Sequence, residues 1–140
     1  MCGCSRRSMF AVVAAGVAAF ALRARAAPAE HRDFIAAAFK MKDAAVRAGD
    51  QPYGAVIVKD GRVLGFGPSR VVLNKDWTAH AEREAIREAQ ARLGRDDLAG
   101  CVLYSTSRPC AECERTAARA NVARMYYGPE ATDAGPPRQS

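Results

Sequence analysis

The stretch "GAVIVKDGRVLGFG" (residues 54–67) contains two short runs of apolar and β-branched residues on either side of Asp60-Gly61. An Asp-Gly pair between two such runs is a strong short-range signal for a two-residue β-hairpin. We therefore expect strands over residues 55–58 and 62–66. The hairpin would begin a sheet, and the flanking sequence indicates what covers it.

Helical patterns lie on both sides of the predicted hairpin. Before it, apolar residues recur at helical spacing from Arg32 to Ala48, and Gly49 ends the pattern. After it, Thr78 can cap a helix that runs from residue 79 to about residue 93 and ends at Gly94. The chain is thus expected to begin with a helix, a hairpin and a second helix.

The rest of the chain alternates between strand and helix patterns. "CVLYSTS" (101–107) and "VARMYYG" (122–128) are rich in β-forming residues, and Pro109 suits the first turn of a helix that runs to about Ala120. Such alternation implies an α/β domain with a mixed, partly parallel sheet covered by helices. We expect one domain over residues 27–128, followed by a Pro/Gly-rich tail (129–140) without regular structure.

The first 26 residues resemble a twin-arginine export leader. Arg6 and Arg7 precede an apolar stretch (9–22) that is short for a membrane span, and Ala24-Arg25-Ala26 is a small-x-small cleavage pattern. We expect cleavage after Ala26, or alternatively after Ala29, and a periplasmic or exported protein that does not associate with the membrane afterwards. A buried N-terminal helix in a cytoplasmic protein is the alternative interpretation.

Removal of the leader changes both the charge and the cysteine count. The formal net charge falls from +6 to +2, because residues 1–26 carry four arginines and no acidic residue. The basic character of the full chain is therefore weak evidence for a nucleic-acid partner, and we do not expect one. Three cysteines remain, an odd number that does not favour a disulfide framework.

Cys110 and Cys113 lie three residues apart at the start of a predicted helix, so both sulfurs are on one helix face. Helix starts favour the thiolate, which is the metal-binding form. A redox pair, half of a structural zinc site and part of a catalytic zinc site all have this spacing. Cys101 lies in a predicted strand and His31 beside the leader, which leaves His80 as a third ligand. Three protein ligands and one open position are typical of a catalytic zinc site.

Glu82 follows His80 by two residues at the start of the preceding predicted helix. A carboxylate at this spacing can lie beside a water bound to the metal without being a ligand itself. It can then accept the proton of that water and later donate it. This combination favours hydrolytic attack on an electrophilic carbon.

Two motifs of the chain, His80-Ala81-Glu82 and Pro109-Cys110-Ala111-Glu112-Cys113, match in order the H-x-E…P-C-x-x-C pattern of zinc deaminases. With "PYGAVIVKDG", "LYSTSRPCAEC" and "MYYG", they make residues 34–128 resemble the cytidine and deoxycytidylate deaminase superfamily, in its branch of guanine deaminases and tRNA adenosine deaminases. The resemblance implies a three-layer α/β/α sandwich with a mixed central sheet, and Zn²⁺ held by His80, Cys110 and Cys113. It also implies hydrolytic deamination, in which zinc-bound hydroxide attacks the amine-bearing ring carbon and Glu82 shuttles protons.

The resemblance also points to residues that contact the base. It implies that the amide of Ala81 and the backbone around Gly54, Ala55 and Val56 border the base. Ser69 stands where relatives carry an Asn that hydrogen-bonds the base, and it offers one hydroxyl in place of an amide. The alternative is that Ser69 only stabilises the turn after Pro68.

Two further departures from the family pattern are Trp77, in place of a common Pro, and Arg108, in place of a Glu. Trp77 either stacks on the base or packs beside the helix start. Arg108 either meets a phosphate or carboxylate, or is solvated like most single arginines.

Three functions are consistent with these observations. The first is a zinc-dependent deaminase of a free nucleobase or nucleoside, with guanine as first candidate because residues 79–104 look most like guanine deaminases. The second is a tRNA adenosine deaminase. The third, from another class, is a non-catalytic zinc-binding or thiol-redox protein. Relatives are commonly dimers, so we also expect a homodimer.

Overall fold

The computed structural model describes residues 28–140, and the predicted leader lies outside this range. The described chain forms, in order, α1 (Ala29–Arg47), β1 (Gly54–Lys59), β2 (Arg62–Pro68), α2 (Ala81–Leu93), β3 (Val102–Ser105), α3 (Ala111–Arg119), β4 (Arg124–Tyr127) and β5 (Thr132–Gly135). None of these helices is long and apolar enough to cross a membrane.

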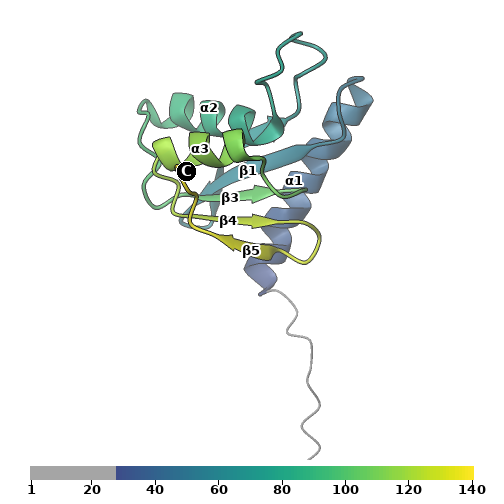
Figure 1. Ribbon diagram of the computed structural model, residues 1–140. Coiled ribbons are helices and arrows are strands. Elements are labelled where there is room, and N and C mark those ends of the chain that lie inside the picture. Colours follow the sequence, from purple (N-terminus) through teal and green to yellow (C-terminus); the bar gives the residue numbers. More distant parts are fainter. Residues whose placement is uncertain (1–27) are drawn as a thin grey trace, which may run out of the picture.

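The strands form one mixed sheet in the order β2-β1-β3-β4-β5 (Figure 1). Among the described strands only β3 and β4 are parallel, whereas β1 pairs antiparallel with β2 and β3, and β5 pairs antiparallel with β4. A parallel pair needs a crossover connection, and α3 supplies it. The predicted mixed, partly parallel sheet is confirmed.

The turn between β1 and β2 is formed by Asp60 and Gly61, as predicted. Both residues have positive φ, 50° and 74°, as a type I′ hairpin turn requires. Each strand is longer than expected, because the ladder continues from the Lys59–Arg62 pair to the pairing of Gly54 with Pro68.

Strand β1 is buried on both faces, which explains its unbroken apolar run. Ala55 and Ile57 belong to the core under α2 and α3, whereas Val56 and Val58 belong to a second core with residues of α1. Figure 1 shows α2 and α3 on one side of the sheet and α1 on the other. The three-layer α/β/α sandwich is therefore confirmed.

Helix α2 begins two residues later than expected, at Ala81, and Thr78 does not cap it. The backbone amide and the hydroxyl of Thr78 both donate to Asp76, at 2.8 and 2.7 Å, and so close a turn before the helix. His80 takes the N-cap position with an extended backbone (φ −62°, ψ 152°). The helix ends at Gly94 in the left-handed conformation, as predicted.

Helix α3 begins at Ala111, with Cys110 as its N-cap. Pro109 therefore lies just before the helix and not in its first turn. The Cys110 sulfur accepts a hydrogen bond from the backbone amide of Cys113, at 3.5 Å. A side chain expected to bind metal thus also caps the helix.

The prediction of no regular structure after Gly128 is wrong, because residues 132–135 form β5. A turn with positive φ at Gly128 and Ala131 leads the chain back along β4. The Arg124 guanidinium then pairs with the Asp133 carboxylate across the two strands, with 2.6 Å between Nη2 and Oδ2. The composition of this segment predicted a loop. Strand pairing and a cross-strand ion pair depend on residues elsewhere in the chain, so composition does not reveal them.

Two glycines of β2 allow α2 to lie directly against the sheet. A Cβ atom at Gly65 would lie 2.0 Å from the carbonyl oxygen of Ala85, and one at Gly67 would lie 2.0 Å from that of Ala81. Both obstacles are helix backbone, which cannot turn away as a side chain can. The position of the first turns of α2 relative to the sheet therefore depends on these glycines.

We expect Gly67→Ala to lower the free energy of unfolding by about 2 kcal/mol or more, because the added methyl overlaps the backbone of α2. Denaturant unfolding at pH 7 measures the change. Gly94→Asn is the matched control, since Asn tolerates positive φ and no atom lies within 4 Å of the added Cβ. Equal losses in the two variants would show that close approach to α2 is not the reason for Gly67.

Candidate active site and metal centre

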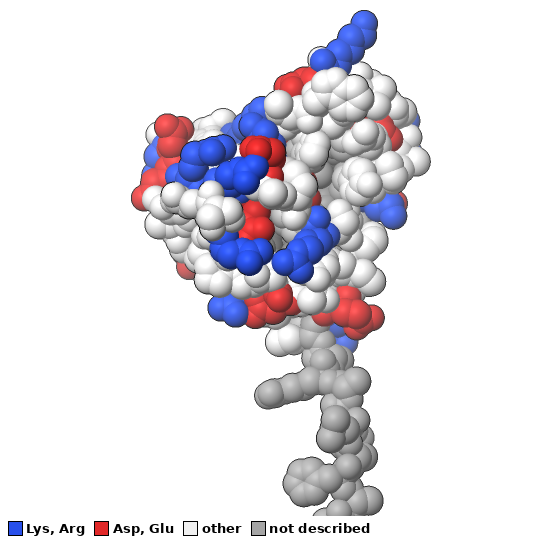
Figure 2. All heavy atoms as spheres, in the orientation of Figure 1, with Lys and Arg blue, Asp and Glu red and all other residues white. Residues whose placement is uncertain are grey.

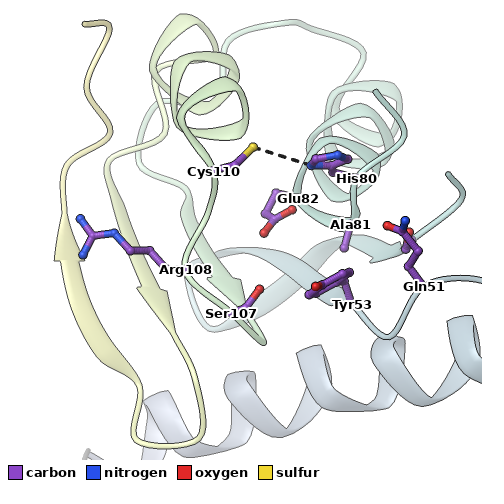
Figure 3. Close-up of a pocket in the computed structure, with 9 residues that line it drawn as sticks. Gln51, Tyr53, His80, Ala81, Glu82, Ser107, Arg108 and Cys110 are labelled. Atoms are coloured by element: carbon purple, nitrogen blue, oxygen red, sulfur yellow. Dashed lines mark hydrogen bonds between the residues drawn. The ribbon is translucent and has the colours of Figure 1, made fainter. Parts of the chain in front are cut away.

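The starts of α2 and α3 lie near each other at one edge of the sheet (Figure 3). His80 is the N-cap of α2, Cys110 is the N-cap of α3, and Cys113 is in the first turn of α3. Ala55 pairs with Ser105, so the beginning of β1 and the end of β3 meet at the same edge. Residues from distant parts of the sequence therefore surround one point.

His80, Cys110 and Cys113 come together, with donor atoms all within 4.8 Å of one another. The Nδ1 atom of His80 is 3.7 Å from the Cys110 sulfur and 3.4 Å from the Cys113 sulfur. Tetrahedral zinc, with its usual bond lengths to nitrogen and sulfur, places such atoms about 3.6 Å apart. One imidazole and two thiolates in this arrangement therefore fit a zinc ion and leave its fourth position to a non-protein ligand.

The other two candidate ligands, Cys101 and His31, lie away from this cluster. Cys101 is fully buried in the core beside β3, and the Nδ1 atom of His31 is 2.7 Å from the Tyr104 hydroxyl. Among the described residues, neither belongs to the His/Cys cluster. The structure thus agrees with the choice of His80 as the third ligand.

Without a metal, the surroundings of Cys113 favour the protonated thiol over the thiolate. Burial raises the pKa of this thiol, and the Glu82 carboxylate, 3.6 Å from the sulfur, raises it further. A divalent cation would reverse the balance, because a thiol that coordinates a metal loses its proton.

Glu82 is buried, with 6% of its surface exposed, and its carboxylate lies 3.6 Å from the sulfur of Cys113. The hydroxyl of Ser105 donates to its Oε1 atom at 2.8 Å, and Oε2 faces the Cys113 sulfur. Ser105 ends β3, so the sheet itself fixes one oxygen of the carboxylate. Nothing local in the sequence predicts this contact, because Ser105 and Glu82 are 23 residues apart.

A cavity of about 330 Å³ opens above these residues, and its wall includes His80, Glu82 and Cys110 (Figure 3). Its size is at the lower end of the range for small-molecule sites. A candidate proton carrier and candidate metal ligands therefore face a space that can hold a small heterocycle.

The structure brings only some of the predicted base contacts into this cavity. Ser69 and Ala81 line it, whereas Gly54, Ala55 and Trp77 do not. The amide and carbonyl of Gly54 are both hydrogen-bonded to Thr106, and Ala55 is buried in the core. Trp77 is 82% exposed and borders a neighbouring depression with Val72 and Lys75.

Arg108, noted above as a departure from the family pattern, also lines the cavity, and so do three residues that were not singled out from the sequence: Gln51, Tyr53 and Ser107. They lie just before β1 or just after β3. The antiparallel pairing of these strands places both segments at one edge, so the strand register is the signal that could have found them. Figure 3 shows the Arg108 guanidinium turned away from Glu82 and His80, and it lies over the Tyr127 ring, 5.8 Å from its centroid.

Comparison with known proteins agrees with this geometry. The profile of the family "Cytidine and deoxycytidylate deaminase zinc-binding region" matches residues 28–129. The chain belongs to this family. It is therefore a deaminase-family protein with a zinc-binding region, and His80, Cys110 and Cys113 can form the metal site.

Within the deaminase family, two kinds of relative are about equally similar. The guanine deaminase of Bacillus subtilis (strain 168) is 40% identical over 105 residues, which are 74% of this chain and 67% of that protein. The tRNA-specific adenosine deaminase of Agrobacterium fabrum is 39% identical over 71% of this chain and 66% of that protein. The chain thus spans about two thirds of their length.

Among solved structures, the X-ray structure of the Bacillus subtilis guanine deaminase superposes with a TM-score of 0.68 at 38% identity. The match covers 70% of this chain and 63% of that one. The fold expected from the resemblance is thus shared with a deaminase of known structure.

We expect the wild-type protein to retain zinc through gel filtration, and His80→Ala and Cys110→Ala to lose it, as measured by elemental analysis. Their melting temperatures should also fall, because a metal that binds only the folded state stabilises it. Cys101→Ala is the matched control: it removes a thiol outside the cluster and should keep zinc. Zinc retained in His80→Ala would mean that the ligand set is different.

We expect Ser105→Ala to keep zinc but lower kcat by about tenfold to a hundredfold, the usual effect of removing a group that orients a residue at a metal site. KM should change little, because Ser105 does not line the cavity. Ser105→Thr, which keeps the hydroxyl, should restore most of kcat. An unchanged kcat in Ser105→Ala would contradict the positioning role.

Proposed function

We propose that the protein is a zinc-dependent hydrolytic deaminase of a free nucleobase or nucleoside, with guanine as the first candidate. The observation that carries the proposal is the arrangement of Glu82: a buried carboxylate, fixed by Ser105, faces a cavity beside one imidazole and two thiols. Metal retention alone does not require this carboxylate. A thiol-redox function does not require it either.

His80, Cys110 and Cys113 would hold the zinc, which when bound would lower the pKa of a water molecule to about 7 and so supply the nucleophile. Glu82 would accept the proton of that water through the oxygen that Ser105 does not occupy. It would then deliver protons to the ring nitrogen beside the amine-bearing carbon and to the departing ammonia. Burial of Glu82 limits the exchange of these protons with solvent.

The size of the cavity and the charges on the described surface support a small substrate. Basic side chains gather beside acidic ones on the face shown in Figure 2. On α2 and α3, Arg87 pairs with Glu84, Arg92 with Glu88 and Arg115 with Glu112. Paired arginines offer less free positive charge for binding a phosphate backbone than unpaired ones.

A tRNA adenosine deaminase is the second candidate, because the similarity to the Agrobacterium fabrum enzyme nearly equals that to the guanine deaminase. The predicted leader separates the two candidates, since an exported protein would not meet cytosolic tRNA. We propose export to the periplasm with cleavage after Ala26, and a homodimer as the assembly. N-terminal sequencing of the protein from cell fractions tests the first point, and sedimentation tests the second.

The test of function is ammonia release by the zinc-loaded protein from guanine, adenosine, cytosine, cytidine and a tRNA that carries adenosine in its anticodon. We expect release from a free base or nucleoside, with guanine first. Release from the tRNA alone would favour the second candidate. No release from any of them would support a non-catalytic zinc-binding or thiol-redox protein.

In the same assay we expect Glu82→Gln to keep zinc and to lower turnover about a thousandfold, equivalent to about 4 kcal/mol of barrier, because the amide cannot carry the proton. Glu84→Gln is the matched control, since Glu84 lies on the same helix, outside the cavity, in an ion pair with Arg87. Near-normal turnover in Glu82→Gln would remove this residue from the proton transfer.

A further inference from the structure

The carboxylate of Asp50 joins two loops beside the cavity. Asp50 lies between α1 and β1 and is only 9% exposed. Its Oδ1 atom accepts hydrogen bonds from the backbone amide of Gln51 (2.7 Å) and from the Ser69 hydroxyl (2.9 Å). Its Oδ2 atom accepts from the amides of Val72 (3.1 Å) and Leu73 (2.9 Å). Both carboxylate oxygens are therefore surrounded by donors.

This arrangement keeps Asp50 ionised at neutral pH. Burial alone would raise the pKa of the carboxyl group, but the amides and the hydroxyl that donate to it lower that pKa by more. An ionised carboxylate can only accept hydrogen bonds. The Ser69 hydroxyl must therefore be the donor in its contact with Asp50.

Ser69 lines the cavity but has no donor to offer it. The residue is 1% exposed, and its only hydroxyl proton is directed to Asp50. Its backbone amide donates to the carbonyl oxygen of Tyr53, at 3.1 Å. What remains for a ligand is a lone pair on the hydroxyl oxygen.

We propose that Ser69, held in this state by Asp50, is a specificity-determining residue that accepts a hydrogen bond from a ring N–H or amino group of the bound heterocycle. This inference rests on the proposed function, because it concerns a base bound in the same cavity. A ligand that turned a carbonyl oxygen or an unprotonated ring nitrogen toward Ser69 would place two acceptors together, with no donor between them. Such a mismatch in a buried site discriminates strongly between similar ligands.

An Asn at position 69 would not impose this restriction. Its amide has both a donor and an acceptor, so it could bond Asp50 or a ligand in more than one way. The pair of Asp50 and Ser69 therefore restricts the choice of ligand edge, which an Asn would leave open.

The test is equilibrium binding of guanine, adenine and cytosine to the zinc-loaded protein, each compared with deaza analogues in which one ring nitrogen becomes C–H. These analogues keep the size of the ring while a single donor or acceptor is removed or moved. We expect Ser69→Ala to weaken the binding of bases that carry one particular ring N–H roughly threefold to tenfold. The affinity for the analogue that lacks this N–H should not change. Ser69→Thr, which keeps the hydroxyl, should restore the difference in affinity between the base and this analogue.

Ser69→Asn gives an independent reading that does not depend on the alanine variant being folded. It should strengthen binding of those analogues that present an acceptor where the preferred base presents N–H. Three outcomes would each overturn the inference. Ser69→Ala could weaken the binding of all bases and analogues equally, or it could weaken the binding only of ligands that present an acceptor. The third outcome is that the wild type binds no base. Ammonia release, measured on the same samples, is a separate readout: donor-dependent binding without ammonia would overturn the proposed function and leave the role of Ser69 standing.

Discussion

The parallel pairing of β3 with β4 determines where the site can be. Parallel neighbours cannot be joined by a tight turn, so α3 must carry the chain back across the sheet, and it starts where β3 ends. Helix α2 covers the same face of the sheet and starts at the same edge. The N-caps of the two helices, His80 and Cys110, are thus neighbours although they are thirty residues apart in sequence.

Much of the fold could be predicted because its signals are local. The period of apolar residues predicted α1, residues typical of helix ends (Thr78, Gly94 and Pro109) predicted α2 and α3, and Asp60-Gly61 predicted the hairpin. What could not be predicted depended on competing or distant partners. Asp76 binds Thr78 and so delays the start of α2, and β5 forms because β4 offers it an edge and Arg124 offers it an ion pair. A single sequence does not reveal such partners.

The candidate site, like the fold, could be predicted only where its signals are local in the sequence. His80, Glu82 and the two cysteines stood out because their spacing within each motif is local, and a missing fourth ligand suggested an open metal position. Ser105 did not stand out, because a serine at the end of a strand is ordinary until the strand is placed beside Glu82, 23 residues away in sequence. Trp77 stood out as unusual, yet it is exposed and borders a different depression.

Asp50 links the conformation of the loop after β2 to the choice of ligand. Three of its four hydrogen bonds hold the segment after β2 against the segment after α1, and one of these three directs the Ser69 proton away from the cavity. A base bound for deamination must turn its amine-bearing carbon toward the metal site. If Ser69 can only accept, the base must also turn an N–H toward it, and the inverted orientation loses that bond. A carboxylate that does not line the cavity would thus help to fix the orientation of the substrate.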